Sequence, residues 1–186
     1  MSPKSNVCTK FVNKHYHAMP RDEVGRFKDM DGEAIHHFLP VSSFTEYTVV
    51  DITHVVKINP LMPLDKACLL ICGVTTGTGA VWKMAQVEKG LTVSIFGLGT
   101  VGLAMAQAAK HNGASKFIGV DLNSEKEEIG KRFAITDFID LKSCGKNKKI
   151  SQAIKDLTDG GADYCFECIG SSTVMKDAFQ SSRQNV

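Results

Sequence analysis

The sequence predicts an α/β fold in which helices cover both faces of a parallel sheet. From residue 91 to residue 179, strand-like and helix-like segments alternate four times, and this alternation is typical of doubly wound parallel sheets. The first strand, Thr92–Phe96, is a short apolar run that a glycine-rich turn follows. Such a run is expected of a parallel strand, because helices bury both of its faces.

The other elements of this part follow in order along the chain. After the turn we expect a helix, a strand over 116–120, a helix from Ser124 to about residue 133, a strand over 136–139, a helix over 149–157, a strand over 162–168 and a helix over 172–179. Ser124 and Glu127 have the spacing of a capping box. Four such strands are expected in the order 3-2-1-4, which leaves the apolar fourth strand at an edge and creates an aggregation risk.

The first 65 residues have a different character. Four of the five prolines fall between residues 20 and 63, and the expected strands are short, over 34–38, 43–50 and 55–58. Three short strands are too few for an independent β domain. We therefore expect residues 1–65 to be the remnant of a larger β unit and residues 66–186 to form a partial parallel-sheet domain. An apolar helix is expected over 64–71, before three glycines interrupt it, and another helix over 80–86.

Composition and charge exclude several classes of protein. The chain has 22 Lys and Arg against 20 Asp and Glu, a basic excess too small to indicate a nucleic-acid partner. No apolar run reaches the ~20 residues of a membrane span, and the first residues show no secretory signal. The six cysteines are therefore expected to be thiols or metal ligands in a soluble cytoplasmic protein.

A glycine motif of the form G-x-G-x-x-G follows the first strand and consists of Gly97, Gly99 and Gly102. The motif opens a helix, and Asp121 lies 19 residues beyond its last glycine, at the end of the next strand. This context distinguishes a dinucleotide-binding turn of a Rossmann sheet from a chance match. The alternative is an ordinary tight turn and a solvated aspartate.

Each residue of the motif has a physical role. Gly97 permits a sharp turn, Gly99 lets the backbone approach a pyrophosphate, and Gly102 lets the helix pack closely on the sheet. Free N–H groups at the helix start then hold the anion. Asp121 would accept hydrogen bonds from the adenosine ribose and repel the extra phosphate of NADP, which favours NAD. Lys126 would contact phosphate or ribose, or else be a solvated lysine.

The motifs GLGTVG, CGVTTG and HHFLPVSSFTEYTVVD together resemble the zinc-dependent medium-chain alcohol dehydrogenases, in particular the plant alcohol dehydrogenase-like group. The resemblance runs from about residue 5 to about residue 179. It implies that residues 1–65 are a remnant of a GroES-like catalytic domain and residues 66–186 part of a Rossmann coenzyme domain. It also implies NAD-linked oxidation of a small alcohol, or reduction of an aldehyde, with a catalytic zinc and usually a structural zinc.

The resemblance also implies roles for particular residues. Cys72, in ICGVTTG, matches a ligand of the catalytic zinc, and Cys8, in NVCTKF, matches the last of four structural-zinc cysteines. Cys165 and Cys168 form C-x-x-C within an apolar strand and are interpreted as core residues. The expected coenzyme contacts are Thr76, Gly97, Leu98, Gly99, Thr100, Val101, Gly102, Asp121, Leu122, Lys126 and Ile169. No catalytic residue is assigned.

Several family residues have no counterpart in this sequence. The other two catalytic-zinc ligands would precede residue 1, and no cysteine precedes Cys8. One ligand of four cannot close a zinc site. Four strands are counted where a complete coenzyme domain has six. We therefore expect a chain truncated at both ends, with incomplete zinc sites, impaired activity and the family homodimer in doubt.

Three interpretations remain open at this point. The chain is an alcohol dehydrogenase seen as a fragment, a non-catalytic NAD-binding fragment, or a non-functional gene product that does not fold stably. Segments near Phe38 and Phe44 are candidates to border a substrate pocket, and packed or exposed aromatic residues are the alternative. The identity of the alcohol is not set by the sequence.

Overall fold

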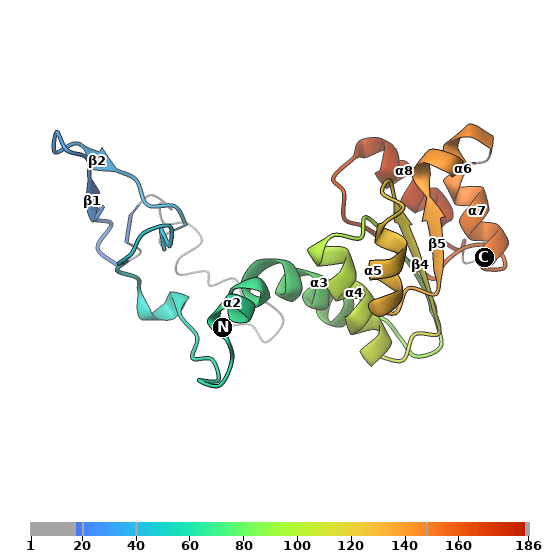
Figure 1. The fold of residues 1–186 in the computed structure, drawn as a ribbon, viewed down its shortest axis with the longest axis horizontal. Helices are drawn as coiled ribbons and strands as arrows, with labels where there is room; N and C mark the ends of the chain where they lie inside the picture. The colour runs from blue at the N-terminus through green and yellow to red at the C-terminus, as the bar shows by residue number, and fades with distance from the viewer. Residues whose placement is uncertain (1–17, 20, 40, 148, 185–186) are drawn as a thin grey trace. The chain divides into compact units, whose positions relative to one another are not determined.

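The computed structural model describes residues 18–19, 21–39, 41–147 and 149–184. The chain divides into two compact units, Met1–Met62 and Pro63–Val186 (Figure 1). Cys8 lies outside the described residues, so the structure does not test its expected role.

The second unit is built on a four-stranded parallel sheet, as the alternation of segments predicted. The strand order is β5-β4-β3-β6, which in chain order is 3-2-1-4. The central strands are β3 (Thr92–Phe96) and β4 (Lys116–Asp121), and the edge strands are β5 (Asp137–Asp140) and β6 (Tyr164–Glu167). Val93 is in register with Phe117 of β4 on one side and with Tyr164 of β6 on the other.

Helices cover both faces of this sheet (Figure 1). On one face, buried residues of α4 (Thr100–His111) pack with Val93 and Ile95 of β3. On the other face, residues of α7 (Ile150–Leu157) and α8 (Ser172–Ser181) pack with Phe96 and Ile118. The two cores alternate along β3 because successive side chains of a strand point to opposite faces. Two short helices, α5 (Lys126–Arg132) and α6 (Leu141–Asn147), follow β4 and β5.

The start of α5 differs from the predicted capping box. The helix begins at Lys126, and no side chain caps its N-terminus. The amide oxygen of Asn123 instead accepts a hydrogen bond from the Glu125 N–H at 3.0 Å, and Glu127 pairs with Lys131 at 2.9 Å. Strand β4 therefore leads through Asp121 into a turn that Asn123 stabilises. This turn shifts the start of α5 by one to two residues from the start predicted at Ser124.

One continuous helical stretch of 22 residues runs from Leu64 to Ala85. It consists of α2 (Leu64–Leu69), the π-helical η2 (Leu70–Val74), α3 (Thr75–Gly79) and the π-helical η3 (Ala80–Ala85). Its mean hydropathy of 1.3 makes it the one helix among the described residues that is long and apolar enough to cross a membrane. The sequence pattern did not predict this length, because the glycines after residue 71 were expected to interrupt the helix. Core helices of water-soluble proteins meet the same criteria of length and hydropathy, so one such helix does not indicate a membrane span.

Gly73, Gly77 and Gly79 lie within the helical stretch and do not interrupt it, which corrects the sequence-based prediction, and the first two lie against α4. A Cβ atom at Gly77 would lie 2.5 Å from the Val101 carbonyl oxygen and 2.8 Å from the Ala104 Cβ. A Cβ atom at Gly73 would lie 2.5 Å from the Thr100 Cγ2. Both glycines therefore let the long helix approach the first turns of α4. Trp82 adds a hydrogen bond from its Nε1 to the Ala108 carbonyl oxygen at 3.2 Å.

The chain returns to the sheet after α8. The Ala162 N–H donates to the Ser181 carbonyl oxygen at 3.0 Å, and the Arg183 N–H donates to the Ala162 carbonyl oxygen at 2.8 Å. Ala162 and Ser182 thus form a parallel bridge just before β6. The Arg183 guanidinium also pairs with Asp163 at 3.3 Å, and Asp163 accepts the Thr92 N–H at the start of β3.

The first unit contains little regular structure among its described residues. Two-residue strands, β1 (Phe27–Lys28) and β2 (Ala34–Ile35), pair antiparallel, and η1 (Ile52–His54) is a 3₁₀ turn. The strands predicted over 43–50 and 55–58 are not formed, and the one over 34–38 is shortened to β2. A strand pattern needs a pairing neighbour and a packed face, and Phe44 is fully exposed here.

A buried carboxylate links two segments of the first unit. Asp51 accepts hydrogen bonds from the Arg21 guanidinium, from the Thr53 N–H at 2.9 Å and from the Thr53 hydroxyl at 2.7 Å. These hydrogen bonds hold the pKa of Asp51 well below its usual range, and the bond from Arg21 has the largest effect. Asp51 therefore ties the chain near residue 21 to the start of η1.

We expect Gly77→Ala to lower the free energy of unfolding by about 2 kcal/mol, because the new methyl group meets the backbone of α4, which cannot move aside. Gly79→Ala is the matched control. No atom lies within 4 Å of a Cβ atom at that position, so the change is expected to be neutral or stabilising by up to about 1 kcal/mol. Urea denaturation measures both variants. Equal stability of the two would contradict the packing described.

Candidate functional site

The candidate site lies at the carboxyl ends of β3 and β6. The order β5-β4-β3-β6 places the crossover from β3 to β4 and the return to β6 on opposite sides of β3. In open parallel sheets, ligands bind outside the carboxyl ends of the strands at this switch point. The glycine loop follows β3, and a second turn over 168–171 follows β6.

Two of the motif glycines are required by close packing. Gly97 has a φ of +93°, and a Cβ atom there would lie 2.8 Å from the Ile169 Cγ1. A Cβ atom at Gly102 would collide with the Gly97 carbonyl oxygen and lie 3.1 Å from the Ile95 Cγ2. The loop therefore folds back on itself as α4 begins. A side chain at Gly102 would separate the helix from the sheet, and one at Gly97 would displace the turn that contains Ile169.

Gly99 has a different environment. It is exposed, and no atom lies within 4 Å of a Cβ atom built there. It is the residue before α4, and no side chain makes a capping hydrogen bond to this helix. The N-terminus of a helix attracts anions through its N–H groups and the helix dipole. The structure thus combines open space and an uncapped helix start where the motif predicts a pyrophosphate.

Asp121 makes hydrogen bonds at the end of β4 that the sequence pattern does not predict. Its Oδ2 accepts the Leu98 N–H at 2.8 Å, and its Oδ1 accepts the Asn123 N–H at 3.0 Å. The carboxylate therefore connects the glycine loop to the neighbouring strand. No sequence signal distinguishes this function from ribose binding, because both place an aspartate at the end of the second strand.

The other expected coenzyme contacts differ in exposure. The Leu98 side chain is fully buried and lies against Gly119 and Gly130, where added Cβ atoms would be 2.8 Å and 3.1 Å from its Cδ1. Only its backbone faces the loop. Side chains that are exposed or partly exposed are those of Thr76, Thr100, Val101, Leu122, Lys126 and Ile169.

Cys72 lies on the π-helical η2 and is exposed. Its neighbour Gly73 contacts Thr100, the first residue of α4. The structure thus brings the segment that carries Cys72 to the glycine loop. Among the described residues, however, no group of three or more His, Cys, Asp or Glu side chains could hold a metal ion. The described part of the chain does not fit a closed zinc site.

Cys165 and Cys168 are partly buried and pack against the cores on opposite faces of the sheet, which agrees with the interpretation of C-x-x-C as core residues. The Ser94 hydroxyl donates to the Cys165 Sγ at 3.0 Å, and the Cys168 Sγ lies 3.4 Å from the Met105 Sδ. Burial, and secondarily Glu167, raises the pKa of the Cys168 thiol to about 11. Burial also raises the pKa of Cys165. Both thiols therefore stay protonated at neutral pH.

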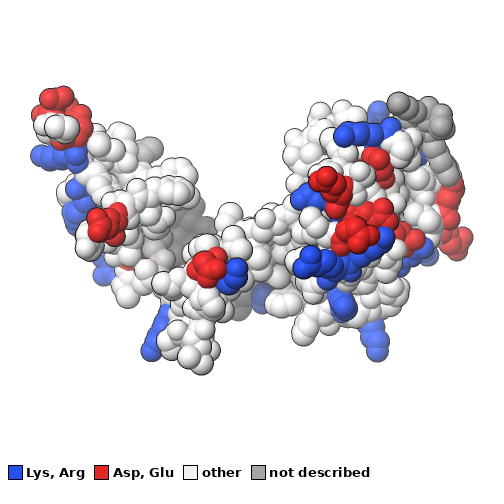
Figure 2. All heavy atoms as spheres, viewed as in Figure 1, with Lys and Arg blue, Asp and Glu red and all other residues white. Residues whose placement is uncertain are grey.

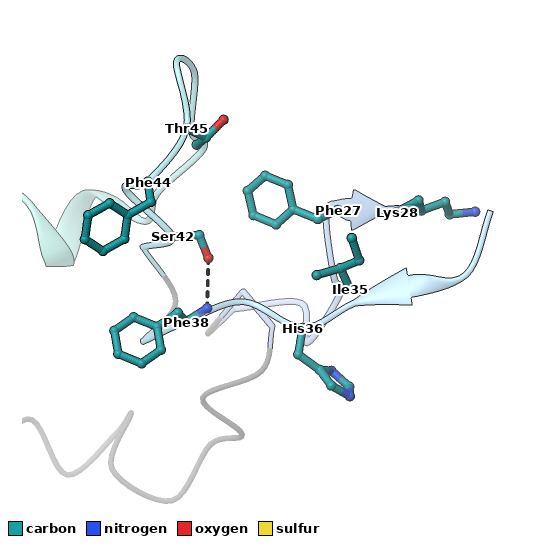
Figure 3. Close-up of a pocket in the computed structure, with 8 residues that line it drawn as sticks. All are labelled: Phe27, Lys28, Ile35, His36, Phe38, Ser42, Phe44 and Thr45. Carbon is teal, nitrogen blue, oxygen red and sulfur yellow. Dashed lines mark hydrogen bonds between the residues drawn. The ribbon is translucent and has the colours of Figure 1, made fainter. Parts of the chain in front are cut away.

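The first unit has an open pocket of about 290 Å³ on its own surface. Figure 3 shows the rings of Phe27, Phe38 and Phe44 around it, with the Phe38 N–H donating to the Ser42 hydroxyl at 2.8 Å. The pocket is lined by Phe27, Lys28, Ile35, His36, Phe38, Ser42, Phe44 and Thr45. Phe38 and Phe44 therefore lie together, although the strand predicted to carry Phe44 is absent.

The charged surface shows no extended field of one sign on the face in Figure 2. Acidic and basic side chains alternate over the second unit, where Lys131 pairs with Glu127 and Glu128 at 2.9 Å and 3.2 Å. Interleaved charges of this kind give little attraction for a polyanion.

Comparison with known proteins identifies similar chains. The zinc-binding dehydrogenase family profile matches residues 100–185. Alcohol dehydrogenase-like 2 of Arabidopsis thaliana is 59% identical over 184 residues, which are 98% of this chain and 47% of the relative. Alcohol dehydrogenase class-3 of Oryza sativa subsp. japonica is 51% identical over 180 residues, 96% of this chain and 46% of the relative.

A solved structure agrees with these relatives. The benzyl alcohol dehydrogenase of Acinetobacter calcoaceticus is similar with a TM-score of 0.77 and 29% identity, over 95% of this chain and 46% of the other. The chain spans about half the length of the curated relatives that it matches.

We expect Gly99→Ala to leave thermal unfolding unchanged and to weaken NADH binding by about tenfold or more, because its methyl group occupies the space for the pyrophosphate. Gly102→Ala is the contrasting variant, since its methyl group meets the Gly97 carbonyl oxygen and is expected to lower the unfolding temperature. Thermal unfolding and a fluorescence titration with NADH separate the two effects. Unaltered NADH binding in Gly99→Ala would show that the coenzyme lies elsewhere.

Proposed function

The chain belongs to the zinc-dependent medium-chain alcohol dehydrogenase family, and on this premise we propose that it is part of an NAD-linked enzyme that oxidises small alcohols or reduces aldehydes. NAD and zinc are the cofactors of this family. The observation that carries the proposal is the open space at Gly99 beside the uncapped N-terminus of α4. When it is bound, NAD would accept the hydride that the alcohol loses on oxidation.

The residues of the second unit fit NAD as follows. The backbone of Gly99 and Thr100 would bind the pyrophosphate, and Asp121 would accept from the adenosine ribose. Lys126 is partly exposed at the start of α5 and would contact the same half of the coenzyme. Val101, Ile169 and Thr76 would border the nicotinamide half.

We propose the same domain division as the sequence suggested, with residues 1–65 from a GroES-like catalytic domain and residues 66–186 from the coenzyme domain. The separation of the two compact units near Met62 supports this division. The cytoplasm is the proposed location, and the exposed cysteines Cys68 and Cys72 are compatible with a reducing compartment.

A second candidate function is NAD binding without turnover. The observation that favours it is the lack, among the described residues, of a group of three side chains that could hold zinc with Cys72. In this case the chain would bind NADH saturably, but it would not form NADH from NAD and an alcohol.

An assay of alcohol-dependent NADH formation separates the two functions. If the chain is an enzyme, we expect turnover that a zinc chelator abolishes and that Cys72→Ser loses. Cys68→Ser is the matched control, because Cys68 is also an exposed thiol and has no assigned ligand role. Saturable NADH binding without turnover would favour the second function, and turnover that survives in Cys72→Ser would contradict the ligand assignment.

Preference for NAD over NADP is expected to depend on the charge of Asp121. Asp121→Asn retains an oxygen that can accept the Leu98 N–H, and it removes the carboxylate that would repel the extra phosphate. We therefore expect its NADH and NADPH dissociation constants to converge by about tenfold. Asp121→Ala also removes the hydrogen bond to the loop and is expected to weaken binding of both coenzymes. An unchanged ratio in Asp121→Asn would contradict the proposed ribose contact.

A further inference from the structure

A second carboxylate binds backbone N–H groups at the other side of the glycine loop. Glu167 is the last residue of β6 and is in register with Phe96, the residue before Gly97. Its Oε1 accepts the Ile169 N–H at 2.8 Å and the Gly170 N–H at 2.9 Å. Its Oε2 accepts the Gly170 N–H at 3.1 Å. The side chain therefore closes the turn that follows β6.

This turn lies directly against the start of the glycine loop. The Cys168 N–H donates to the Phe96 carbonyl oxygen at 2.9 Å. A Cβ atom at Gly97 would lie 2.8 Å from the Ile169 Cγ1 and 3.4 Å from the Cys168 carbonyl carbon. Ile169 is itself 43% exposed, so one side of it packs on the loop and the other faces outward.

The order of the strands determines which half of a dinucleotide would reach this turn. Asp121 lies at the end of β4, Gly99 follows β3, and Ile169 follows β6, in the spatial order β4-β3-β6. If the adenosine ribose is at Asp121 and the pyrophosphate at Gly99, the remaining half extends over the turn after β6. Ile169 and Gly170 would then form the wall next to the nicotinamide ribose.

We propose that Glu167 is a positioning residue for the coenzyme, because its carboxylate fixes the Ile169–Gly170 turn after β6, where the nicotinamide half would lie. The proposal rests on the proposed NAD-binding function. Gly170 has a φ of +81°, and the two hydrogen bonds to Glu167 hold it in that conformation. Without an acceptor, both N–H groups would turn to water and Ile169 would lose its fixed place beside Gly97.

Binding of NADH and of AMP to the intact chain tests the proposal, because AMP carries only the adenosine half. In Glu167→Ala we expect NADH binding to weaken by about fivefold or more, as for the loss of charge-assisted hydrogen bonds, with AMP binding unchanged. Glu167→Gln keeps an oxygen that can accept both N–H groups, so it is expected to bind NADH as the wild type does. Glu167→Met is the second acceptor-free variant, because it retains the length of the side chain.

Glu88→Ala is the matched control, since it removes an exposed glutamate from the segment that precedes β3, at the opposite end of the sheet. Equal losses of NADH and AMP binding in Glu167→Ala and Glu167→Met would indicate a general structural role and overturn the proposal. A loss in Glu167→Gln as large as in Glu167→Ala would show that an oxygen acceptor for the two N–H groups is not sufficient, which also overturns the proposal. Unchanged NADH binding in the acceptor-free variants would overturn this proposal alone, whereas failure of the wild type to bind NADH would overturn the proposed function with it.

Discussion

The second unit depends on a close approach between backbones that only glycine permits. Gly102 places the first turn of α4 on the Gly97 carbonyl oxygen, and Gly77 places the long helix on the carbonyl oxygen of Val101 in that same turn. Helix α4 is therefore held from two sides, by the end of β3 and by a second helix. Because its N-terminus is fixed in this way, the exposed Gly99 can leave its open space at a defined place.

Carboxylates stabilise the loops on both sides of this helix start. Asp121 accepts an N–H group of the glycine loop from the end of β4, and Glu167 accepts two N–H groups from the end of β6. Asp121 and Glu167 are the last residues of β4 and β6, so both carboxylates are held by paired strands. The loops after β3 and β6 are thus attached to the sheet by charged acceptors, which form stronger hydrogen bonds to backbone N–H groups than neutral acceptors do.

The sheet could be predicted from the sequence because its evidence is local. Alternating apolar runs and helical faces gave the four strands and their order, and the spacing from Gly102 to Asp121 located the candidate site. The long helix was missed because Gly73 and Gly77 are helix-breaking by propensity, and only the packing partner α4 explains their presence. The strand over 43–50 failed for the converse reason, since its favourable residues find no pairing neighbour among the described residues. The contacts of Asp121 with Leu98 and of Glu167 with Gly170 depend on loop geometry, which no spacing rule contains.

The bridge between Ala162 and Ser182 lies beside β6, at one edge of the four-stranded sheet. An open edge strand offers unpaired N–H and C=O groups to any other extended chain. Here the segment after α8 already occupies the first pairing position beside β6, and the ion pair between Arg183 and Asp163 holds it there. A strand from a neighbouring molecule would have to displace this segment before it could pair along the full edge. The returning chain thus covers backbone groups at the amino end of β6 that would otherwise be open to a neighbouring strand.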